Sequence, residues 1–319
     1  MAIVAGIDEA GFGPLLGPLV VTGSAFRIPD DRFDECLWNL YAATCTKKAQ
    51  RNDRRLIVAD SKEVLHLQEG RSQLERTVLV FLTASGARPA TWKSLLKWAT
   101  PRSAHEVDEY PWYVEDFGLP VFPASGDIAT RTNAILHQSR SCEAEWLGFF
   151  SEPLPEGHYN KLIVATRNKS SALLGLVMRV VHRILTHGDD RLVRINVDRL
   201  GGRMRYREAL QTAFPEFEIR ILEESLERSA YRLTSPRRVC NVEFATGGED
   251  LHFCIALASM FSKYVRELYM HAFNSFWSAQ QAGLQPTAGY YTDAQRWLKE
   301  AAPSLDRLHV NRAMLVRQR

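Results

Sequence analysis

The chain has 319 residues, of which 45% are hydrophobic and 24% are charged, as in an ordinary globular protein of one large or two modest domains. No apolar run reaches the roughly eighteen residues of a membrane span, and acids at positions 8 and 9 interrupt the stretch that a secretory signal requires. The net charge of +3 does not by itself indicate a nucleic-acid-binding protein. The five cysteines form no Cys-x-x-Cys pair, which predicts reduced thiols in the cytoplasm rather than a zinc site.

The first predicted element is a strand that ends in two adjacent carboxylates. Apolar residues from Ile3 to Ile7 lead into Asp8 and Glu9, a Gly-x-Gly-Pro turn follows at 11–14, and a second apolar run covers 19–26. This pattern predicts a strand, a tight loop and a strand. Because side chains alternate across a strand, both acids can face one way only if the strand ends there. Acids beside glycine amides suit divalent metal and phosphate chemistry. The simpler interpretation is a polar turn.

Further elements follow in chain order. Apolar spacing and turn residues predict them, and Ser170 is expected to cap the helix that starts at residue 170. Strands and helices in this order, with acids at strand ends, indicate an α/β protein. The predicted elements are a helix at 34–43, a helix at 64–87, a helix at 170–185, a strand at 193–198, strands at 217–222 and 231–244 with a hairpin near Ser235, a long helix at 251–279 and a helix at 293–301.

The residues from Asp8 to Val20 resemble the opening motif of the type 2 ribonucleases H (ribonuclease HII and its relative HIII), usually written DEAGRGPLAGPVV. This motif is the most specific part of the resemblance, whereas the DSK-like tripeptide is weak alone. The other motifs follow in family order up to about residue 312. They are Asp60-Ser61-Lys62 for DSK, residues 193–198 for the strand with the third carboxylate, residues 255–267 for the AAASIIAKVTRD helix, and residues 289–292 and 308–312 for the KGYGT and HRRSF elements.

The resemblance implies that Asp8, Glu9, Asp198 and a fourth acid are catalytic and hold one or two Mg²⁺ or Mn²⁺ ions. The fourth aspartate of the family stands ten positions before the serine of the helix, which selects Glu249 here, and a slip of one residue would select Asp250. Glutamate departs from the family pattern, although its longer side chain can still reach a hard cation. A capping or turn role remains the alternative for Asp198, and carboxylates are favoured just before a helix in any case.

The resemblance also implies a set of residues that bind substrate. The glycines would read a ribose 2′-hydroxyl through their backbone, Lys62 would steady a phosphate, and Tyr290 would stack on a sugar. Phe12 stands where ribonuclease HII has an arginine, so a planar guanidinium that matches phosphate is missing. A half-buried aromatic is the alternative for Tyr290. The implied substrate-binding residues are Gly11, Phe12, Gly13, Ser61, Lys62 and Tyr290.

Residues 88–125 are rich in proline, tryptophan and tyrosine and look like an insertion into the family's compact core, with bounds of about 88–158. Their second acidic pair, Asp108-Glu109, follows no apolar strand, which favours a surface loop. The aromatics are expected to form a small satellite core, and stacking on nucleic acid is the alternative. The rest of the expectation is a single domain over 1–319 with a helical C-terminal part at about 250–319.

By resemblance, the fold is a ribonuclease H-like mixed sheet flanked by helices. The implied activity is metal-dependent endonucleolytic cleavage of the RNA strand of RNA/DNA hybrids or at DNA–RNA junctions, which leaves 5′-phosphate and 3′-hydroxyl ends. The expected partner is an RNA/DNA hybrid or ribonucleotide-containing DNA, and a cytoplasmic monomer without membrane contact is expected. Two alternatives stay open, a hybrid-binding homologue that is weakly active or inactive, and another nuclease of ribonuclease H-like fold.

Overall fold

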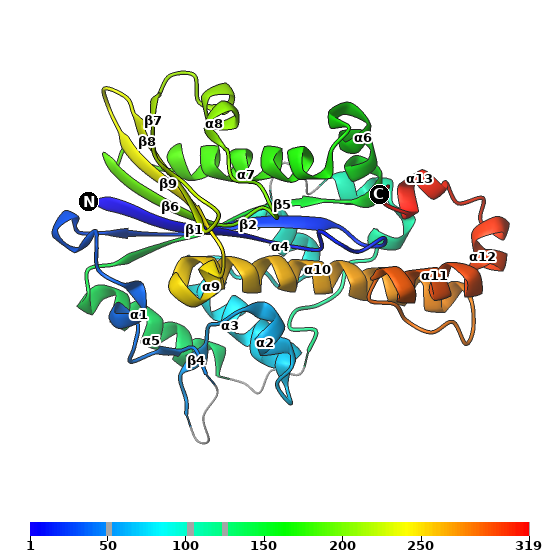
Figure 1. The fold of residues 1–319 in the computed structure, drawn as a ribbon. Helices are drawn as coiled ribbons and strands as arrows, with labels where there is room; N and C mark the ends of the chain where they lie inside the picture. Colours follow the sequence, from blue (N-terminus) through cyan, green and yellow to red (C-terminus); the bar gives the residue numbers. More distant parts are fainter. Residues whose placement is uncertain (49–52, 101–104, 123–126, 319) are drawn as a thin grey trace.

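A mixed sheet of seven strands forms the central layer of the computed structural model, which describes residues 1–48, 53–100, 105–122 and 127–318 (Figure 1). The expected α/β architecture, with helices on both faces and a helical C-terminal part, is confirmed. The strands in spatial order are β5 (Glu145–Leu154), β2 (Leu19–Ile28), β1 (Ala2–Ala10), β6 (Leu192–Asp198), β9 (Val239–Ala245), β8 (Arg228–Thr234) and β7 (Glu218–Glu224).

The interior strand β1 is apolar on both sides because both of its faces are covered. Ile3, Ala5 and Ile7 belong to the core on one face, and Val4 belongs to the core on the other. β1 runs antiparallel to β2 and parallel to β6, which in turn runs parallel to β9. The carboxyl ends of three neighbouring strands, β1, β6 and β9, therefore meet at one edge of the sheet.

One long helix covers each face of the sheet, α7 (Lys169–Leu185) on one side and α10 (Phe253–Gln280) on the other (Figure 1). The helix α10 lies directly on the backbone of β1. A Cβ atom added to Gly6 would stand 2.3 Å from the amide nitrogen of Ile255, so only glycine allows this contact. Beyond α10, the helices α3 (Gly70–Ala84) and α5 (Ile128–Ser141) complete the larger of the two cores.

The remaining elements are short, and they are found mainly on the α3 side of the sheet and in the C-terminal part (Figure 1). They are α1 (Leu37–Leu40), β3 (Cys45–Thr46), β4 (Leu56–Ile57), α2 (Ser61–Leu65), α4 (Trp92–Ala99), α6 (Glu156–Thr166), α8 (Arg207–Ala213), α9 (Gly248–Leu251), α11 (Tyr291–Glu300), α12 (Ala302–Arg307) and α13 (Arg312–Leu315), with 3₁₀ turns at Asp30–Arg32, Glu106–Glu109 and Pro111–Tyr113.

Three of the sequence predictions need correction. The helix expected at 64–87 is two helices, α2 and α3, whereas the long helix expected at 251–279 is confirmed as α10. The aromatic residues within 88–125 do not form a separate satellite core, because their buried members belong to the larger of the two cores. Ser170 does not cap α7, because the Asn168 side chain accepts hydrogen bonds from the amides of Ser170 (2.8 Å) and Ser171 (3.2 Å). Asparagine at the N-cap satisfies two amides that the helix itself cannot pair.

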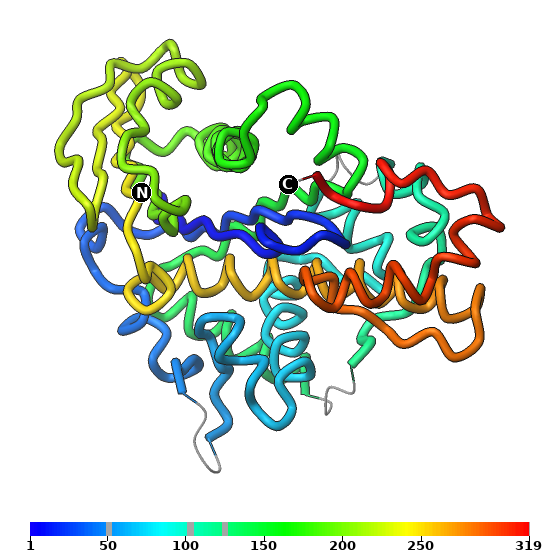
Figure 2. The backbone as a smooth tube through the Cα atoms, turned by 45° about the vertical axis from the view of Figure 1, so that its right-hand side comes forward, coloured from blue at the N-terminus to red at the C-terminus, as the bar shows by residue number. Residues whose placement is uncertain are grey.

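The C-terminal part packs along the second half of α10 and then returns to the N-terminal region. Figure 2 shows the last segment running from α12 back towards the loop between β1 and β2. The main-chain amide of Arg317 donates a hydrogen bond to the carbonyl oxygen of Leu15 (2.9 Å), which closes this path. Within the described residues, no helix combines the length and the hydropathy that a membrane crossing would need.

Candidate active site

Three carboxylates from distant parts of the chain converge at the edge where β1, β6 and β9 end. Asp8 belongs to β1, Asp198 is the last residue of β6, and Glu249 lies in α9 just after β9. One carboxylate oxygen of each lies within 4.8 Å of the others. Glu9 lines the same pocket. Asp8 and Glu9 were expected to face one way only if the strand ended there, but β1 continues to Ala10. The structure thus brings together all four acids that the sequence nominated as catalytic.

A glycine turn delivers Glu249 to this edge. Gly247 has a φ of +66°, a conformation that favours glycine, and the amide of Gly248 donates a hydrogen bond of 3.2 Å to Asp198 Oδ1. A Cβ atom on Gly248 would stand 2.5 Å from Ile255 Cδ1. The chain therefore turns tightly against both Asp198 and α10 before Glu249.

The neighbouring Asp250 lies outside the group. It is exposed, does not line the pocket, and its main-chain oxygen accepts a hydrogen bond of 2.6 Å from Lys47 Nζ. Of the two candidates for the fourth acid, the geometry therefore groups Glu249 with Asp8 and Asp198.

Burial and mutual repulsion make the ionised forms of these acids unfavourable. Burial, and then repulsion from Glu9 and Glu249, raise the pKa of Asp8 well above its usual value, and Asp8 is only 6% exposed. Burial, followed by repulsion from Asp198 and Glu249, raises the pKa of Glu9 to about 7. Burial also raises the pKa of Asp198 and of Glu249. Converging oxygen ligands that repel one another fit a hard divalent cation, which would neutralise them.

The pocket around the acids has a volume of about 420 Å³. Every residue nominated for substrate binding lines it: Gly11, Phe12, Gly13, Ser61, Lys62 and Tyr290. The Lys62 side chain is 80% exposed, and Asp60 caps α2 by accepting a 2.9 Å hydrogen bond from the Lys62 amide. Proximity to Asp60 raises the pKa of Lys62, which keeps its ammonium charged beside the acids. Tyr290 is 53% exposed at the mouth of the pocket.

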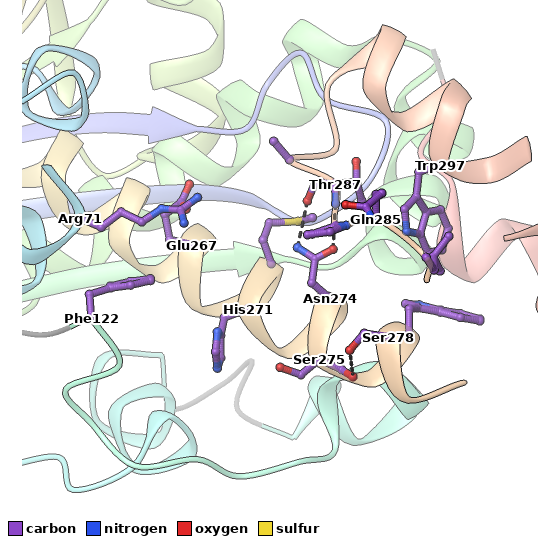
Figure 3. Close-up of a pocket in the computed structure, with 15 residues that line it drawn as sticks. Arg71, Phe122, Glu267, His271, Asn274, Ser275, Ser278, Gln285, Thr287 and Trp297 are labelled. Atoms are coloured by element: carbon purple, nitrogen blue, oxygen red, sulfur yellow. Dashed lines mark hydrogen bonds and ion pairs between the residues drawn. The ribbon is translucent and has the colours of Figure 1, made fainter. Parts of the chain in front are cut away.

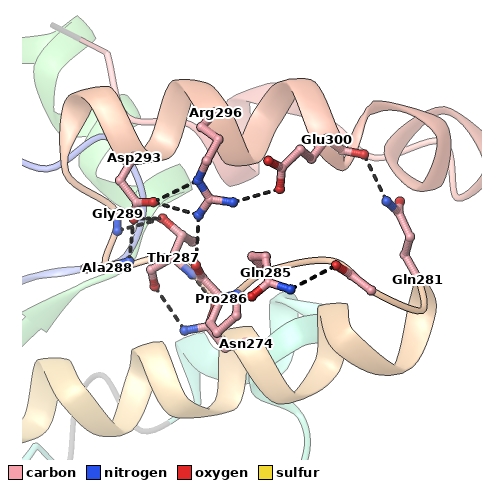
Figure 4. Close-up of polar contacts among 11 residues, drawn as sticks. Asn274, Gln281, Gln285, Pro286, Thr287, Ala288, Gly289, Asp293, Arg296 and Glu300 are labelled. Atoms are coloured by element: carbon pink, nitrogen blue, oxygen red, sulfur yellow. Dashed lines mark hydrogen bonds and ion pairs between the residues drawn. The ribbon is translucent and has the colours of Figure 1, made fainter.

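The turn that presents Tyr290 is fixed by a local polar network (Figure 4). Asp293 Oδ2 accepts hydrogen bonds from Thr287 Oγ1 (2.6 Å) and from the Ala288 amide (2.8 Å), and Arg296 pairs with Asp293 Oδ1 at 2.6 Å. The Thr287 hydroxyl also accepts a hydrogen bond of 3.0 Å from the Gly289 amide. These contacts hold the two residues before Tyr290 in place.

Sequence reasoning missed three polar residues of the pocket: His66, which follows α2, and Ser259 and Lys263, which lie on α10. Ser259 donates a hydrogen bond of 3.1 Å to the Ser61 hydroxyl, and Lys263 pairs with Glu267 at 2.8 Å. Both belong to the segment that resembles the family helix. Their spacing of four residues, which places them on one helix face, was the available signal.

A second cavity, of about 520 Å³, lies farther along α10 (Figure 3). The Glu267 carboxylate lines it and pairs with both Lys263 of the acidic pocket (2.8 Å) and Arg71 of the second cavity (3.3 Å). Inside, Asn274 exchanges hydrogen bonds of 3.0 and 2.9 Å with the Thr287 backbone. The second cavity therefore adjoins the acidic pocket across one chain of ion pairs.

Comparisons with known proteins give similar structures at low identity. No family model and no curated protein matches the chain. A chain of the PCNA–RNase HII complex from Archaeoglobus fulgidus is 16% identical with a TM-score of 0.48, over 99% of this chain and 94% of that one. Ribonuclease H2 from Pyrococcus horikoshii OT3 is 12% identical with a TM-score of 0.43, over 98% and 92%. A Bst-RNase HIII complex with Mn²⁺ is 12% identical with a TM-score of 0.42, over 99% and 66%.

Proposed function

We propose that this chain is a metal-dependent endoribonuclease of the cytoplasm that cuts the RNA strand of RNA/DNA hybrids or at DNA–RNA junctions. The observation that carries the proposal is the convergence of Asp8, Asp198 and Glu249, with their oxygens within 4.8 Å of one another. Glu9 and the first four residues of the loop 11–18, here named the glycine loop, line the same pocket. A cluster of acids alone would not indicate a nucleic-acid substrate, but acids beside free backbone amides, a lysine and an exposed tyrosine do.

One set of pocket residues would bind the cation, and another set would bind the substrate. Asp8, Glu9, Asp198 and Glu249 would hold Mg²⁺ or Mn²⁺, which when bound would lower the pKa of a water and stabilise charge on the phosphate. Lys62, with its exposed ammonium, would hold a phosphate of the scissile strand. Tyr290 offers an exposed ring against a sugar or base. By the family resemblance, the products carry 5′-phosphate and 3′-hydroxyl ends.

A cluster of arginines that follows Asp198 in the sequence supports a nucleic-acid partner, although Glu208 and Glu224 line the same cavity as these arginines. Arg203, Arg205 and Arg207 follow Asp198 in the chain and line a cavity of about 880 Å³ between α7, α8 and β7. Within the described part of the chain, none of these guanidinium groups pairs with a carboxylate. Unpaired arginines are suited to phosphate oxygens.

The test uses the purified protein with Mg²⁺ or Mn²⁺ on three labelled duplexes: an RNA/DNA hybrid, a DNA duplex with one ribonucleotide, and plain DNA. We expect cleavage of at least one of the two ribonucleotide-containing duplexes and no cleavage of plain DNA. Absence of cleavage with either metal would contradict the proposal, and binding to the same duplexes would then favour the non-catalytic alternative. Cleavage of plain DNA would favour another nuclease of this fold.

Two of the three glycines of the loop, Gly11 and Gly13, should respond differently to alanine. Gly11 has a φ of +86°, and its added Cβ would stand 2.5 Å from the Pro18 carbonyl oxygen, so Gly11→Ala should destabilise the fold by about 1–3 kcal/mol. A Cβ on Gly13 meets no atom within 4 Å among the described residues. Gly13→Ala should therefore leave the melting temperature unchanged but lower kcat/KM on the hybrid by at least about tenfold, because the methyl group fills the space of the substrate. Unchanged cleavage by Gly13→Ala would show that the substrate does not approach there.

Metal affinity should depend on pH near neutrality. Because the pKa of Glu9 is raised to about 7, this carboxyl carries a proton below that pH and must release it to bind a cation. The affinity for Mn²⁺ should therefore rise between about pH 6 and about pH 8, by up to about tenfold per pH unit below the pKa. Calorimetry in buffers of different ionisation enthalpy measures both the affinity and the released protons. Glu9→Gln is the control and should weaken both the affinity and its pH dependence.

A further inference from the structure

The end of the chain is anchored beside the glycine loop by one buried side chain. Asn160 of α6 is 5% exposed, and its Nδ2 donates hydrogen bonds of 2.7 Å to the carbonyl oxygens of Ala313 and Val316. Its Oδ1 accepts a hydrogen bond of 2.7 Å from the Gln318 amide. The backbone on both sides of Arg317 is therefore fixed, although this segment follows the last helix.

Arg317 uses this position to hold the start of the glycine loop from behind. Its guanidinium donates hydrogen bonds to the carbonyl oxygens of Gly11 and Phe12, the latter at 3.1 Å. The group is 3% exposed and lies 4.0 Å from the centroid of the Tyr159 ring. Burial of a cation costs free energy unless its N–H groups are hydrogen-bonded. The two carbonyl oxygens therefore stabilise the buried guanidinium, and the guanidinium in turn fixes their direction.

The rest of the glycine loop is also held by hydrogen bonds to other parts of the protein. The Gly17 amide donates a hydrogen bond of 2.9 Å to Glu156 Oε1, and Arg266 donates one of 3.2 Å to the Leu16 carbonyl oxygen. The amides of Leu15 and Leu16 both donate to the Gly289 carbonyl oxygen, at 2.8 and 3.2 Å. By contrast, over the part of the chain that the structure describes, the amides at positions 11–13 have no hydrogen-bond acceptor.

The geometry of the peptide bond links Arg317 to these free amides. The peptide bonds of the loop are trans, so each carbonyl points opposite to the N–H group that follows it. Arg317 draws the carbonyls of Gly11 and Phe12 to the buried side, which turns the N–H groups of Phe12 and Gly13 towards the other side. That side faces the acidic pocket, which both residues line.

We propose that Arg317 is a positioning residue that aims the Phe12 and Gly13 amides at an acceptor oxygen of the ribose–phosphate backbone. This proposal rests on the proposed function. Arg317 does not itself reach the substrate, because the loop lies between its guanidinium and the pocket. Its role is to prevent the peptide planes from rotating, so that two donors are already oriented when the nucleic acid binds.

The test compares Arg317→Met with Arg317→Lys and with Arg312→Met, a matched control on the same segment whose arginine is exposed and pairs with Asp306 only at 3.8 Å. One readout is amide hydrogen exchange of residues 15–17. The other is the ratio of the dissociation constants for a DNA duplex and an RNA/DNA hybrid, measured by fluorescence anisotropy without divalent metal. Arg317→Met should speed exchange and lower the hybrid preference, each by at least about tenfold. Arg317→Lys should be intermediate, and Arg312→Met should match the wild type.

These readouts separate the positioning role from the proposed function. Unchanged loop exchange and unchanged hybrid preference in Arg317→Met would overturn the proposal, as would a wild-type protein with no preference for the hybrid. If the wild type prefers the hybrid but cleaves nothing, the proposed activity fails, whereas faster exchange and lost preference in Arg317→Met would still support the positioning role. Should Arg317→Met fail to fold, Arg317→Lys decides, and wild-type behaviour of that variant would overturn the proposal.

Discussion

Asp8→Asn should abolish cleavage and at the same time stabilise the metal-free protein. Asp8 is buried among three other acids, and its pKa is raised well above the usual value, so its ionised form is unfavourable in the folded state. Asparagine has nearly the same shape and no charge. We expect kcat on the hybrid to fall at least about 10³-fold and the free energy of unfolding at about pH 8 to rise by about 1–2 kcal/mol.

The sign of this stability change depends on pH and on metal. A raised carboxyl pKa means that the folded state binds more protons than the unfolded state, so the contribution of Asp8 to stability is lost as the pH rises. The advantage of Asp8→Asn should therefore be largest at alkaline pH and shrink in acid. Saturating Mn²⁺ should reverse the order, because only the wild type gains about 2.7 kcal/mol at a hundredfold excess over its dissociation constant. Thermal unfolding with and without Mn²⁺ measures this.

An exposed acid that borders the site in the sequence provides the control. Glu63 lies on α2 next to Lys62 but does not line the pocket. Glu63→Gln removes one negative charge from the same region and should change neither kcat nor the melting temperature appreciably. A loss of activity in Asp8→Asn without any gain in metal-free stability would indicate that the four acids do not repel one another as their positions imply.

The acids could be identified from the sequence because each stands where the apolar run of a strand ends or just before a long helix. Asp8 and Asp198 end apolar runs, and the pairing of β1 with β6 brings such ends together. Glu249 needed a count from the helix motif. The strand β5 was missed because Gly148 and Pro153 interrupt its pattern, which is acceptable at the edge of a sheet where few backbone donors must pair.

The residues that hold the glycine loop could not be nominated in the same way. Arg317 contacts Gly11 across 306 positions, and Glu156 contacts Gly17 across 139. Hydrophobic periodicity indicates which residues share a face of one helix or strand. It does not predict that a single polar side chain from a distant part of the sequence will enter the core. Local patterns therefore predicted which residues line the pocket, whereas the contacts that hold the glycine loop depend on the tertiary path of the chain.

The pair of variants Glu249→Gln and Asp250→Asn gives the sharpest test of the register of the fourth acid. Both remove one carboxylate charge from adjacent residues of the same short helix. Glu249 joins the group whose oxygens lie within 4.8 Å of one another, whereas Asp250 is exposed and outside the pocket. We expect Glu249→Gln to lower kcat at least about 10³-fold, because it removes a proposed ligand of the cation, and Asp250→Asn to retain activity within about a factor of two, as for a surface change.

The same pair should differ in metal binding even if cleavage is weak. Glu249→Gln should lower the affinity for Mn²⁺ by about 10- to 100-fold, measured by calorimetry, while Asp250→Asn binds like the wild type. A glutamate reaches farther than the aspartate of the related motif, so Glu249→Asp shortens the ligand by one methylene and should recover only part of the affinity. The reverse pattern, with Asp250→Asn inactive and Glu249→Gln active, would place the fourth ligand one residue later and would require α9 to turn by about 100° relative to the arrangement described above.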